Sequence, residues 1–424
     1  MVVNKAITYA ILAAVTLVPW NATAVNRYSV NNLLPEMHFN GGKSSAKLVT
    51  EGINTAVNLA GGFAENMLVK SLLEITQGKN QQALSTINEL LSKTPNFKLA
   101  HLVRGDLLMA QANSLQAFGS ANPPAAVKDL QDEARMRIER YLSNQSKSYA
   151  PDMLIAPNAE QKHVVVIDTD RSRLYLYKNE NGKLDYVSDY YVSVGKNGLD
   201  KQTEGDKRTP IGVYFAKAKL TQPLPDFYGV GAYPLNYPNE WDSTHNRKGS
   251  GIWLHGTPSS TYSRPPRASD GCVVLTNPDL QAIGPILQTG KTPVIIASNL
   301  KWSDSGDTIS EKKALDNAIT QWLADWKSQN TAQYLGHYSN NFSSNGISFQ
   351  QWSEHKYRVQ AGKPNVTINL SDISMFAYPD AEKKLVVVDF MQNFKSPALS
   401  NMMHKRQYWI LENNQWKIIY EGAA

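Results

Sequence analysis

Two side chains that can do covalent chemistry together, His255 and Cys272, lie seventeen positions apart in the chain. Cys272 is the single cysteine among 424 residues, and it stands in the run Ser-Asp-Gly-Cys-Val-Val-Leu at 269–275. A thiol attacks a carbonyl mainly as the thiolate, so a catalytic cysteine needs an imidazole within hydrogen-bond reach. His255 ends an apolar, strand-like run, and Gly256 lets the chain turn after it. The pair predicts a cysteine nucleophile with a histidine partner; the alternative is a small buried hydrophobic cysteine.

The composition is that of ordinary globular material with a mild positive charge. Hydrophobic residues make up 42% and charged residues 19% of the chain, and the formal net charge is +6. This length favours about two to four domains. The positive charges form no block of five or more, so we expect no nucleic-acid partner. A weakly basic surface suits an anionic polymer.

The first residues have the pattern of a secretory signal peptide, which we assign to 1–24. Lys5 precedes an apolar run of about 13 residues, too short for the roughly 20 that a membrane-spanning helix needs. Ala-Thr-Ala at 22–24 is a small-residue cleavage site, and an uncleaved anchor is the alternative. Export predicts a periplasmic protein, in which a single cysteine is either inert or a free reactive thiol.

Three segments of different periodicity follow the predicted signal. Residues 25–150 carry apolar residues at helical spacing, with offsets like those of a tetratricopeptide repeat, and predict an α-helical domain. So few repeat units seldom stand alone, so this domain should pack on its neighbour, pair with a second copy as a homodimer, or bind a partner. Residues 160–300 are rich in β-branched and aromatic residues and predict a mostly β domain. Residues 310–424 predict helices followed by strands, an α+β domain.

The middle segment resembles the catalytic domain of the L,D-transpeptidases, bacterial cell-wall enzymes with a cysteine nucleophile. The resemblance is carried by ordered motifs: strand-like runs at 164–168 and 174–177, the segment 191–196, the Gly-Asp, Thr-Pro, Gly and Tyr signature within 204–214, the His-Gly pair at 255–256 and the Ser-Asp-Gly-Cys run at 269–272. It implies that Cys272 attacks the diaminopimelate carbonyl of a peptidoglycan stem peptide and forms a thioester. It also implies that His255 moves the proton, that the backbone carbonyl of Gly256 orients His255, and that the amides of Gly271 and Cys272 are oxyanion donors.

The last segment resembles the nuclear transport factor 2-like cone of helices on a curved sheet. Its closing strand patterns, at 388–394, 405–409 and 416–421, carry that resemblance. The domain order is similar to a branch of the L,D-transpeptidase family that includes cell-shape-determining L,D-carboxypeptidases. We expect its aromatic residues to form a core rather than a ligand site, and we expect a structural or peptidoglycan-positioning role.

The acceptor that resolves the thioester stays open. An amine from another stem peptide would give a cross-link, a lipoprotein lysine would give an anchor or its reversal, and water would give L,D-carboxypeptidase activity. Most members of the family carry Arg or Asn two places after the nucleophile, where this chain has Val274. Arg264 or Arg267 can supply the missing cation and hold a substrate carboxylate, or both can be solvated loop charges. A non-catalytic peptidoglycan-binding scaffold is the hypothesis from another class.

Three further residues are weaker candidates for substrate binding. Tyr233 and Trp241 can line the donor channel, although an aromatic residue in a β domain usually belongs to the core. Ser269 can hold the cysteine loop through local hydrogen bonds. We interpret His245 as a surface histidine. The remaining histidines are scattered without partners at metal-ligand spacing, so we expect no metal and no cofactor.

Overall fold

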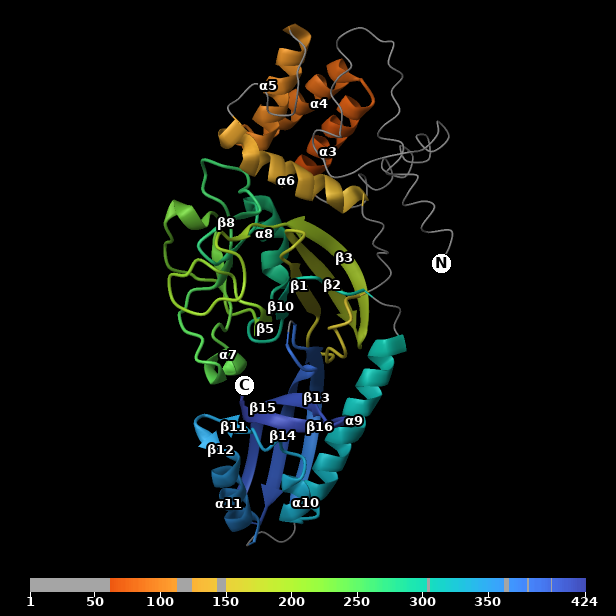
Figure 1. Ribbon diagram of the computed structural model, residues 1–424, viewed down its shortest axis with the longest axis vertical. Helices are drawn as coiled ribbons and strands as arrows, with labels where there is room; N and C mark the ends of the chain where they lie inside the picture. The colour runs from red at the N-terminus through yellow and green to blue at the C-terminus, as the bar shows by residue number, and fades with distance from the viewer. Residues whose placement is uncertain are drawn as a thin grey trace.

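The computed structural model describes residues 62–112, 124–142, 150–302, 306–361, 366–379, 381–397 and 399–424, and the predicted signal peptide at 1–24 lies outside them. Three bodies follow one another along the long axis: helices α3 to α6 at one end, a central body around strands β1 to β10, and a C-terminal sheet with helices α9 to α11 at the other end (Figure 1). The multidomain class predicted from the sequence is confirmed.

The N-terminal domain is helical, as its periodicity predicted. Its four described helices are α3 (Phe63–Thr76), α4 (Asn80–Lys93), α5 (Lys98–Ala112) and α6 (Pro124–Leu142). Gly78 turns the chain between the first two with a φ of 73°, a conformation that glycine adopts without strain. Apolar residues three and four positions apart make one buried core, which includes Leu68, Leu72, Ile87 and Leu90. The helix α6 lies across the central domain (Figure 1).

The central domain is built on a five-stranded sheet in the order β3-β2-β1-β10-β5. Its strands are β1 (His163–Asp168), β2 (Arg173–Glu180), β3 (Lys183–Tyr191), β5 (Gly212–Phe215) and β10 (Pro293–Ala297). Shorter elements complete the domain: β4 (Val194–Gly195), η2 (Asp226–Tyr228), β6 (Ala232–Pro234), α7 (Glu240–Thr244), β7 (Trp253–His255), β8 (Arg267–Ser269), β9 (Val273–Val274), α8 (Asn277–Ile283) and η3 (Gly284–Ile286). Strands β6, β7 and β9, in that order, form a second, small sheet.

Both faces of the five-stranded sheet are covered, which explains the continuous apolar runs of β1 and β10. Val165 and Ile167 of β1 belong to a core shared with Leu254 and Val273 of the small sheet. The alternate residues of β1 belong to a different core, shared with Tyr408 and other residues of the C-terminal domain. A strand buried on both faces reads as an unbroken hydrophobic run. The five-stranded sheet therefore packs against the small sheet with one face and against the C-terminal domain with the other.

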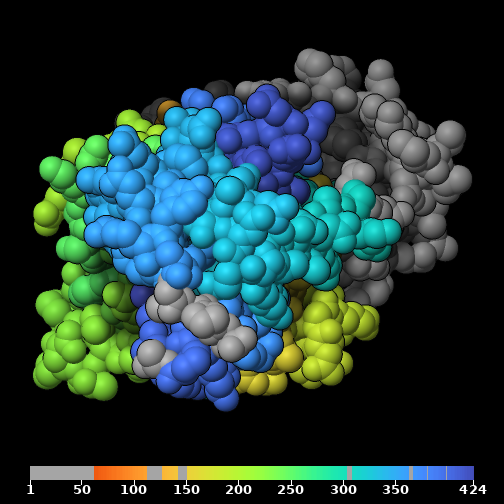
Figure 2. Space-filling model, turned by 90° about the horizontal axis from the view of Figure 1, so that it is seen from below, coloured from red at the N-terminus to blue at the C-terminus, as the bar shows by residue number. Residues whose placement is uncertain are grey.

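The C-terminal domain is a four-stranded antiparallel sheet covered by helices on one face. Its elements are α9 (Gly306–Lys327), α10 (Thr331–Leu335), β11 (Ser343–Ser344), β12 (Ile347–Ser348), α11 (Phe349–Gln360), β13 (Thr367–Ala377), β14 (Leu385–Ser396), β15 (Leu399–Glu412) and β16 (Gln415–Ala423). In the view from below, α9 and α10 in cyan and α11 in light blue cover this end of the molecule (Figure 2), and α10 contacts both of the other helices. The expected aromatic core is present, with Trp322, Tyr334 and Trp409 fully buried.

A buried arginine joins the C-terminal domain to the central domain. Arg406 on β15 pairs with Asp389 on β14 at 2.7 Å and reaches Glu240 on α7 at 3.0 Å. Its guanidinium also lies 4.5 Å from the centre of the Phe215 ring on β5. A buried charge must be paired because it has lost its hydration. The contact therefore fixes how the two domains meet.

We predict that Arg406→Ala lowers the free energy of unfolding by about 3 kcal/mol, because it leaves the carboxylate of Asp389 buried without its partner. Urea unfolding followed by tryptophan fluorescence measures the change. The matched control is Arg358→Ala at an exposed position of α11, which should change stability by less than about 0.5 kcal/mol. Equal effects of the two substitutions would contradict the role assigned to Arg406.

Candidate active site

The parallel pairing of β7 with β9 brings His255 and Cys272 to neighbouring positions. Leu254 pairs with Val273 and His255 with Val274, and Cys272 directly precedes the first pair. Residues two apart on a strand share a face, and so do paired residues on adjacent strands. Leu254 and Val273 face the core, so His255 and Cys272 share the opposite face of the small sheet. The structure thus places together the two residues that the sequence singled out.

His255 is held in one tautomer by its neighbour in the chain. Its Nδ1 lies 2.7 Å from the carbonyl oxygen of Gly256. Because a carbonyl only accepts hydrogen bonds, Nδ1 carries the hydrogen and Nε2 is the basic nitrogen. The ring packs against Tyr228 at 5.1 Å and Phe227 at 5.9 Å between ring centres. Burial lowers the pKa of His255 to about 4, so the imidazole is neutral at pH 7.

The thiol of Cys272 is half-buried and protonated at rest. Its Sγ donates to the carbonyl oxygen of Gly251 at 3.2 Å. Burial raises the pKa of the thiol to about 11, against the opposing effects of a backbone hydrogen bond from Trp253 and the charge of Arg264. The resting pair is therefore a neutral thiol beside a neutral imidazole. Attack on a carbonyl requires Nε2 to remove the thiol proton.

Ser269 and Thr209 hold the backbone on which Cys272 sits. The hydroxyl of Ser269 donates to the carbonyl of Cys272 at 2.6 Å and accepts from the amide of Gly271 at 3.1 Å. The hydroxyl of Thr209 donates to the carbonyl of Gly271 at 2.9 Å. Gly271 has a φ of 121°, and a Cβ there would meet the carbonyl of Arg208 at 2.8 Å. The loop therefore requires glycine immediately before Cys272.

These contacts bear on two expectations. Of the two roles considered for Ser269, the local one is observed: its buried hydroxyl is engaged within the loop and positions Cys272. Gly271 was a candidate oxyanion donor, but its amide is occupied by Ser269, so the amide of Cys272 remains the candidate for that role. Thr209 was missed as a site residue. Its position in the Thr-Pro signature marks the segment but does not reveal which backbone it holds.

Gly256 is required by close packing as well as by its carbonyl. A Cβ at this position would lie 2.1 Å from Oδ1 of Asn277. That side chain accepts from the amide of Val230 at 3.1 Å and donates to the carbonyl of Thr257 at 2.9 Å. Asn277 therefore joins the turn after His255 to the loop that contains Val230. Sequence analysis did not single it out, because nothing in its local pattern distinguishes it from an ordinary residue at the start of a helix.

The two arginines proposed to hold a carboxylate have different surroundings in the structure. The guanidinium of Arg264 lies 4.4 Å from the centre of the Phe227 ring, the same ring that packs against His255. Its charge acts on the pKa of both His255 and Cys272. Arg267 is exposed on β8. Arg264 is therefore the cation that the fold places beside the reacting pair.

Tyr233 and Trp241, the aromatic candidates for the donor channel, lie elsewhere. Tyr233 pairs with Leu254 on β7, so strand alternation turns it to the core face, opposite His255, where it packs against Gly284. Trp241 stacks on Tyr408 of the C-terminal domain with ring centres 5.5 Å apart. Both side chains pack against buried cores, which is the alternative that the sequence left open for them. Their places depend on strand register and on a domain junction.

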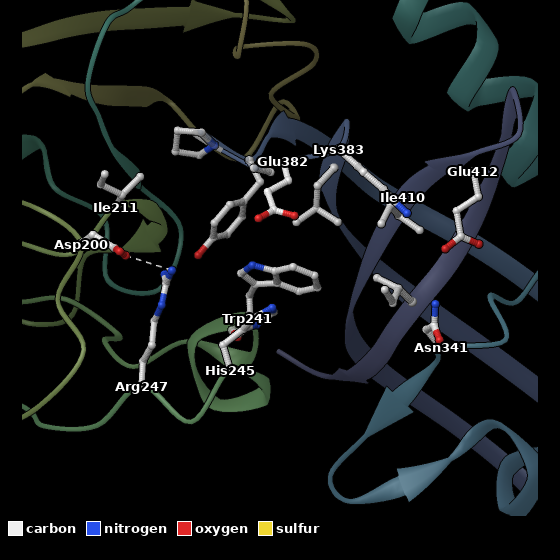
Figure 3. Close-up of a pocket in the computed structure, with 15 residues that line it drawn as sticks. Asp200, Ile211, Trp241, His245, Arg247, Asn341, Glu382, Lys383, Ile410 and Glu412 are labelled. Carbon is white, nitrogen blue, oxygen red and sulfur yellow. Dashed lines mark hydrogen bonds and ion pairs between the residues drawn. The ribbon is translucent and has the colours of Figure 1, made fainter.

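Trp241 lines a cavity between the central and C-terminal domains (Figure 3). The cavity has a volume of about 560 Å³, and its wall also includes Tyr378, Glu382 and Lys383. His245 is exposed, as expected, and stands next to Trp241 with ring centres 4.3 Å apart. Arg247 at the rim pairs with Asp200 at 3.0 Å. This cavity is distinct from the Cys272 and His255 face of the small sheet.

The described residues offer no group of three or more His, Cys, Asp or Glu side chains that could hold a metal ion. None of the helices in the described ranges combines the length and the apolar character needed to cross a membrane.

Comparison with known families now identifies the class of protein. The model of the L,D-transpeptidase catalytic domain, YkuD, matches residues 162–296, and that of the Cds6 C-terminal NTF2-like domain matches residues 314–422. The chain therefore carries an L,D-transpeptidase catalytic domain followed by a C-terminal NTF2-like domain, and both resemblances seen in the sequence are confirmed. No curated protein sequence matches the chain.

Solved structures share this arrangement. Bd1075 of Bdellovibrio bacteriovorus is 24% identical, with a TM-score of 0.56 over 65% of this chain and 99% of that one. Pgp2 of Campylobacter jejuni, described as a helical cell shape determining protein, is 24% identical, with a TM-score of 0.57 over 64% of this chain and 95% of that one. At this identity the likeness establishes the fold.

We predict that Gly256→Ala lowers catalytic turnover by about a hundredfold, because the new methyl group displaces Asn277 and with it the carbonyl that orients His255. The control is Gly105→Ala within α5, where a Cβ meets nothing within 4 Å. That change should leave turnover unaltered and stabilise the helix by up to about 1 kcal/mol. Normal turnover of Gly256→Ala would show that the carbonyl of residue 256 does not orient the imidazole of His255.

The pH dependence of alkylation tests the resting state of the pair. We predict that the rate of Cys272 labelling by iodoacetamide rises up to about pH 11, because burial keeps the thiol protonated below its raised pKa. The same chain unfolded in guanidinium should show a midpoint near the ordinary thiol value of about 8.5. A plateau between pH 6 and 8 in the folded protein would instead indicate a thiolate and imidazolium pair.

Proposed function

We propose that the protein is a periplasmic, peptidoglycan-modifying cysteine acyltransferase of the L,D-transpeptidase type. The observation that carries the proposal is the shared face of His255 and Cys272, with the imidazole tautomer set by the carbonyl of Gly256. The substrate is a stem peptide with a diaminopimelate carbonyl followed by a terminal D-residue. The family match at 162–296 supports this substrate class.

In the first half-reaction Nε2 of His255 takes the proton of Cys272, and the sulfur attacks the diaminopimelate carbonyl. The oxygen of the tetrahedral intermediate accepts a hydrogen bond from the amide of Cys272, and a donor of this kind contributes about 3 kcal/mol. As the intermediate collapses, the bond to the terminal D-residue breaks, and His255 passes its proton to the leaving amine. The product is a thioester on Cys272.

Arg264 is suited to hold a carboxylate of the stem peptide during this step. Its guanidinium is half-buried, and burial lowers its pKa while the charges of Asp270 and Cys272 act in the opposite direction. A partly desolvated guanidinium gains more from a carboxylate than a fully hydrated one does. This charge takes the role of the cation that Val274 does not supply.

In the second half-reaction an amine attacks the thioester and His255 removes its proton. The bond between the acyl carbon and the sulfur then breaks, and His255 returns the proton to the sulfur of Cys272. A stem-peptide amine gives a cross-link, and a lipoprotein lysine gives a covalent anchor. Water as the acceptor gives L,D-carboxypeptidase activity, or cleavage of a lipoprotein from peptidoglycan. Pgp2, a protein of similar fold, is described as a helical cell shape determining protein, and this description favours a role in cell shape.

The test uses disaccharide-tetrapeptide muropeptides with the full chain and with Cys272→Ala, and resolves the products by liquid chromatography and mass spectrometry. Dimers that depend on Cys272 would support transpeptidation, and tripeptides without dimers would support carboxypeptidation. Cys272→Ala should lower either product by at least about a thousandfold.

A second substrate, a muropeptide with a bound lipoprotein peptide, completes the test. Release or attachment of that peptide by the wild type alone would assign the lipoprotein reaction. Failure of every substrate with the wild-type protein would contradict an acyltransferase and favour the non-catalytic peptidoglycan-binding scaffold.

A further inference from the structure

The segment between the two reacting residues is docked on the N-terminal helical domain. The carbonyl of Asn96, in the turn between α4 and α5, accepts from the amide of Tyr262 at 3.1 Å. The side-chain amide of Asn96 donates to the carbonyl of Ser259 at 2.9 Å. The ring of Phe97 packs on that of Tyr262 with centres 4.7 Å apart. Residues 257–266, which carry Arg264, are therefore held by a helix-to-helix turn of another domain.

A buried carboxylate of α6 holds the same segment one residue before Arg264. The hydroxyl of Ser263 donates to Oε1 of Glu133 at 2.6 Å. Glu133 is itself paired with Arg137 at 2.9 Å, and Arg137 with Glu65 of α3 at 2.7 Å. Each of these charged side chains is at least nine-tenths buried. A hydroxyl held by a charged acceptor in a water-poor site has one preferred position.

Tyr191 of β3 fixes the backbone of Arg264 itself. Its hydroxyl donates to the carbonyl of Arg264 at 2.9 Å, and the guanidinium of Arg137 lies 3.9 Å from the centre of its ring. The helical domain thus reaches Arg264 from both sides, through Ser263 and through Tyr191.

The same charges bind the helical domain to the central sheet. Arg173 of β2 pairs with Glu65, and Arg140 of α6 pairs with Asp189 of β3. Arg137 keeps its charge in spite of burial, because Glu133 and Glu65 raise its pKa more than desolvation lowers it. Breaking one partner of such a set leaves an uncompensated buried charge, so sliding or rotation of the helical domain is strongly disfavoured.

We propose that the N-terminal helical domain is a positioning element of the active site: through Asn96, Phe97 and Glu133 it holds residues 257–266 so that the guanidinium of Arg264 stays beside His255 and Cys272. The guanidinium covers the Phe227 ring that packs against His255. A long arginine side chain loses rotamer entropy when it is fixed, so a rigid backbone beneath it favours one location of its charge. Glu133 and Ser263 are positioning residues, since they act through Arg264.

The experiment compares two alkylating reagents on the single thiol. Iodoacetate is an anion and iodoacetamide is neutral, so the ratio of their rates reports the positive charge near the sulfur and cancels the thiolate fraction. Every label reports Cys272, because the chain has one cysteine. The ratio for each folded protein is divided by the ratio for the same chain unfolded in guanidinium.

Arg264→Gln sets the scale, and it should lower the normalised ratio about fivefold. Ser263→Ala and Asn96→Ala should each lower it about twofold to threefold, and the double variant should approach Arg264→Gln. The matched control is Asn88→Ala, which removes a 2.8 Å hydrogen bond from Arg104 within the helical domain and should leave the ratio unchanged. Circular dichroism at the assay temperature verifies that each variant is folded. Because Asn96 lies in a partly exposed turn, Asn96→Ala tests the proposal even if Ser263→Ala is unstable.

Two results would overturn the proposal: an unchanged ratio in the folded Asn96 and Ser263 variants while Arg264→Gln lowers it, or an unchanged ratio in Arg264→Gln itself. The readout needs no peptidoglycan substrate. Failure of the proposed acyltransferase reaction would therefore leave this result standing, and the two proposals fail separately.

Discussion

The parallel pairing of β7 with β9 is the contact on which the rest of the site depends. It consists of two residue pairs, Leu254 with Val273 and His255 with Val274. One face of these short strands is anchored in the core beneath them, and the other presents the imidazole and the thiol. Two strands this short have little stability of their own. The large sheet below and the loops around them must therefore supply the rigidity that the chemistry needs.

Burial keeps the reacting pair unreactive until a substrate arrives. The low pKa of His255 and the high pKa of Cys272 have the same main cause, which is loss of hydration. A protonated thiol is a poor target for oxidation, since susceptibility follows thiolate character. Burial therefore limits oxidation of the single cysteine in the chain. When a substrate carbonyl enters the site, the sulfur can attack it as the thiol proton moves to His255. The reactivity of the thiol is therefore coupled to substrate binding.

The sequence predicted which residues would lie together better than it predicted their surroundings. His255, Gly256 and Cys272 stand in short motifs of fixed order, so a family resemblance singled them out. The sequence could not decide between the two roles of Tyr233, because a shift of one residue along a strand changes the face on which a side chain lies. The contact of Ser263 with Glu133 joins residues 130 positions apart, and no local pattern predicts it. The periodicity of the sequence was enough to predict the three-domain class. It did not predict the contacts by which the domains join.

Buried charges hold both domain junctions, with Arg137 and its carboxylates at one and Arg406 with Asp389 at the other. Such pairs add orientation more than stability, because desolvation offsets much of their attraction. The catalytic domain is thus fixed from both ends, and the helical end reaches the loop between the reacting residues.

The proposed chemistry requires Cys272 to carry the acyl group of the donor as a thioester. Intact-protein mass spectrometry after brief incubation with a disaccharide-tetrapeptide and an acid quench would detect this intermediate. We expect a mass increase equal to the donor without its terminal D-residue, removable by hydroxylamine and absent from Cys272→Ala. Products formed at an undiminished rate by Cys272→Ala, with no adduct on the wild-type protein, would contradict it.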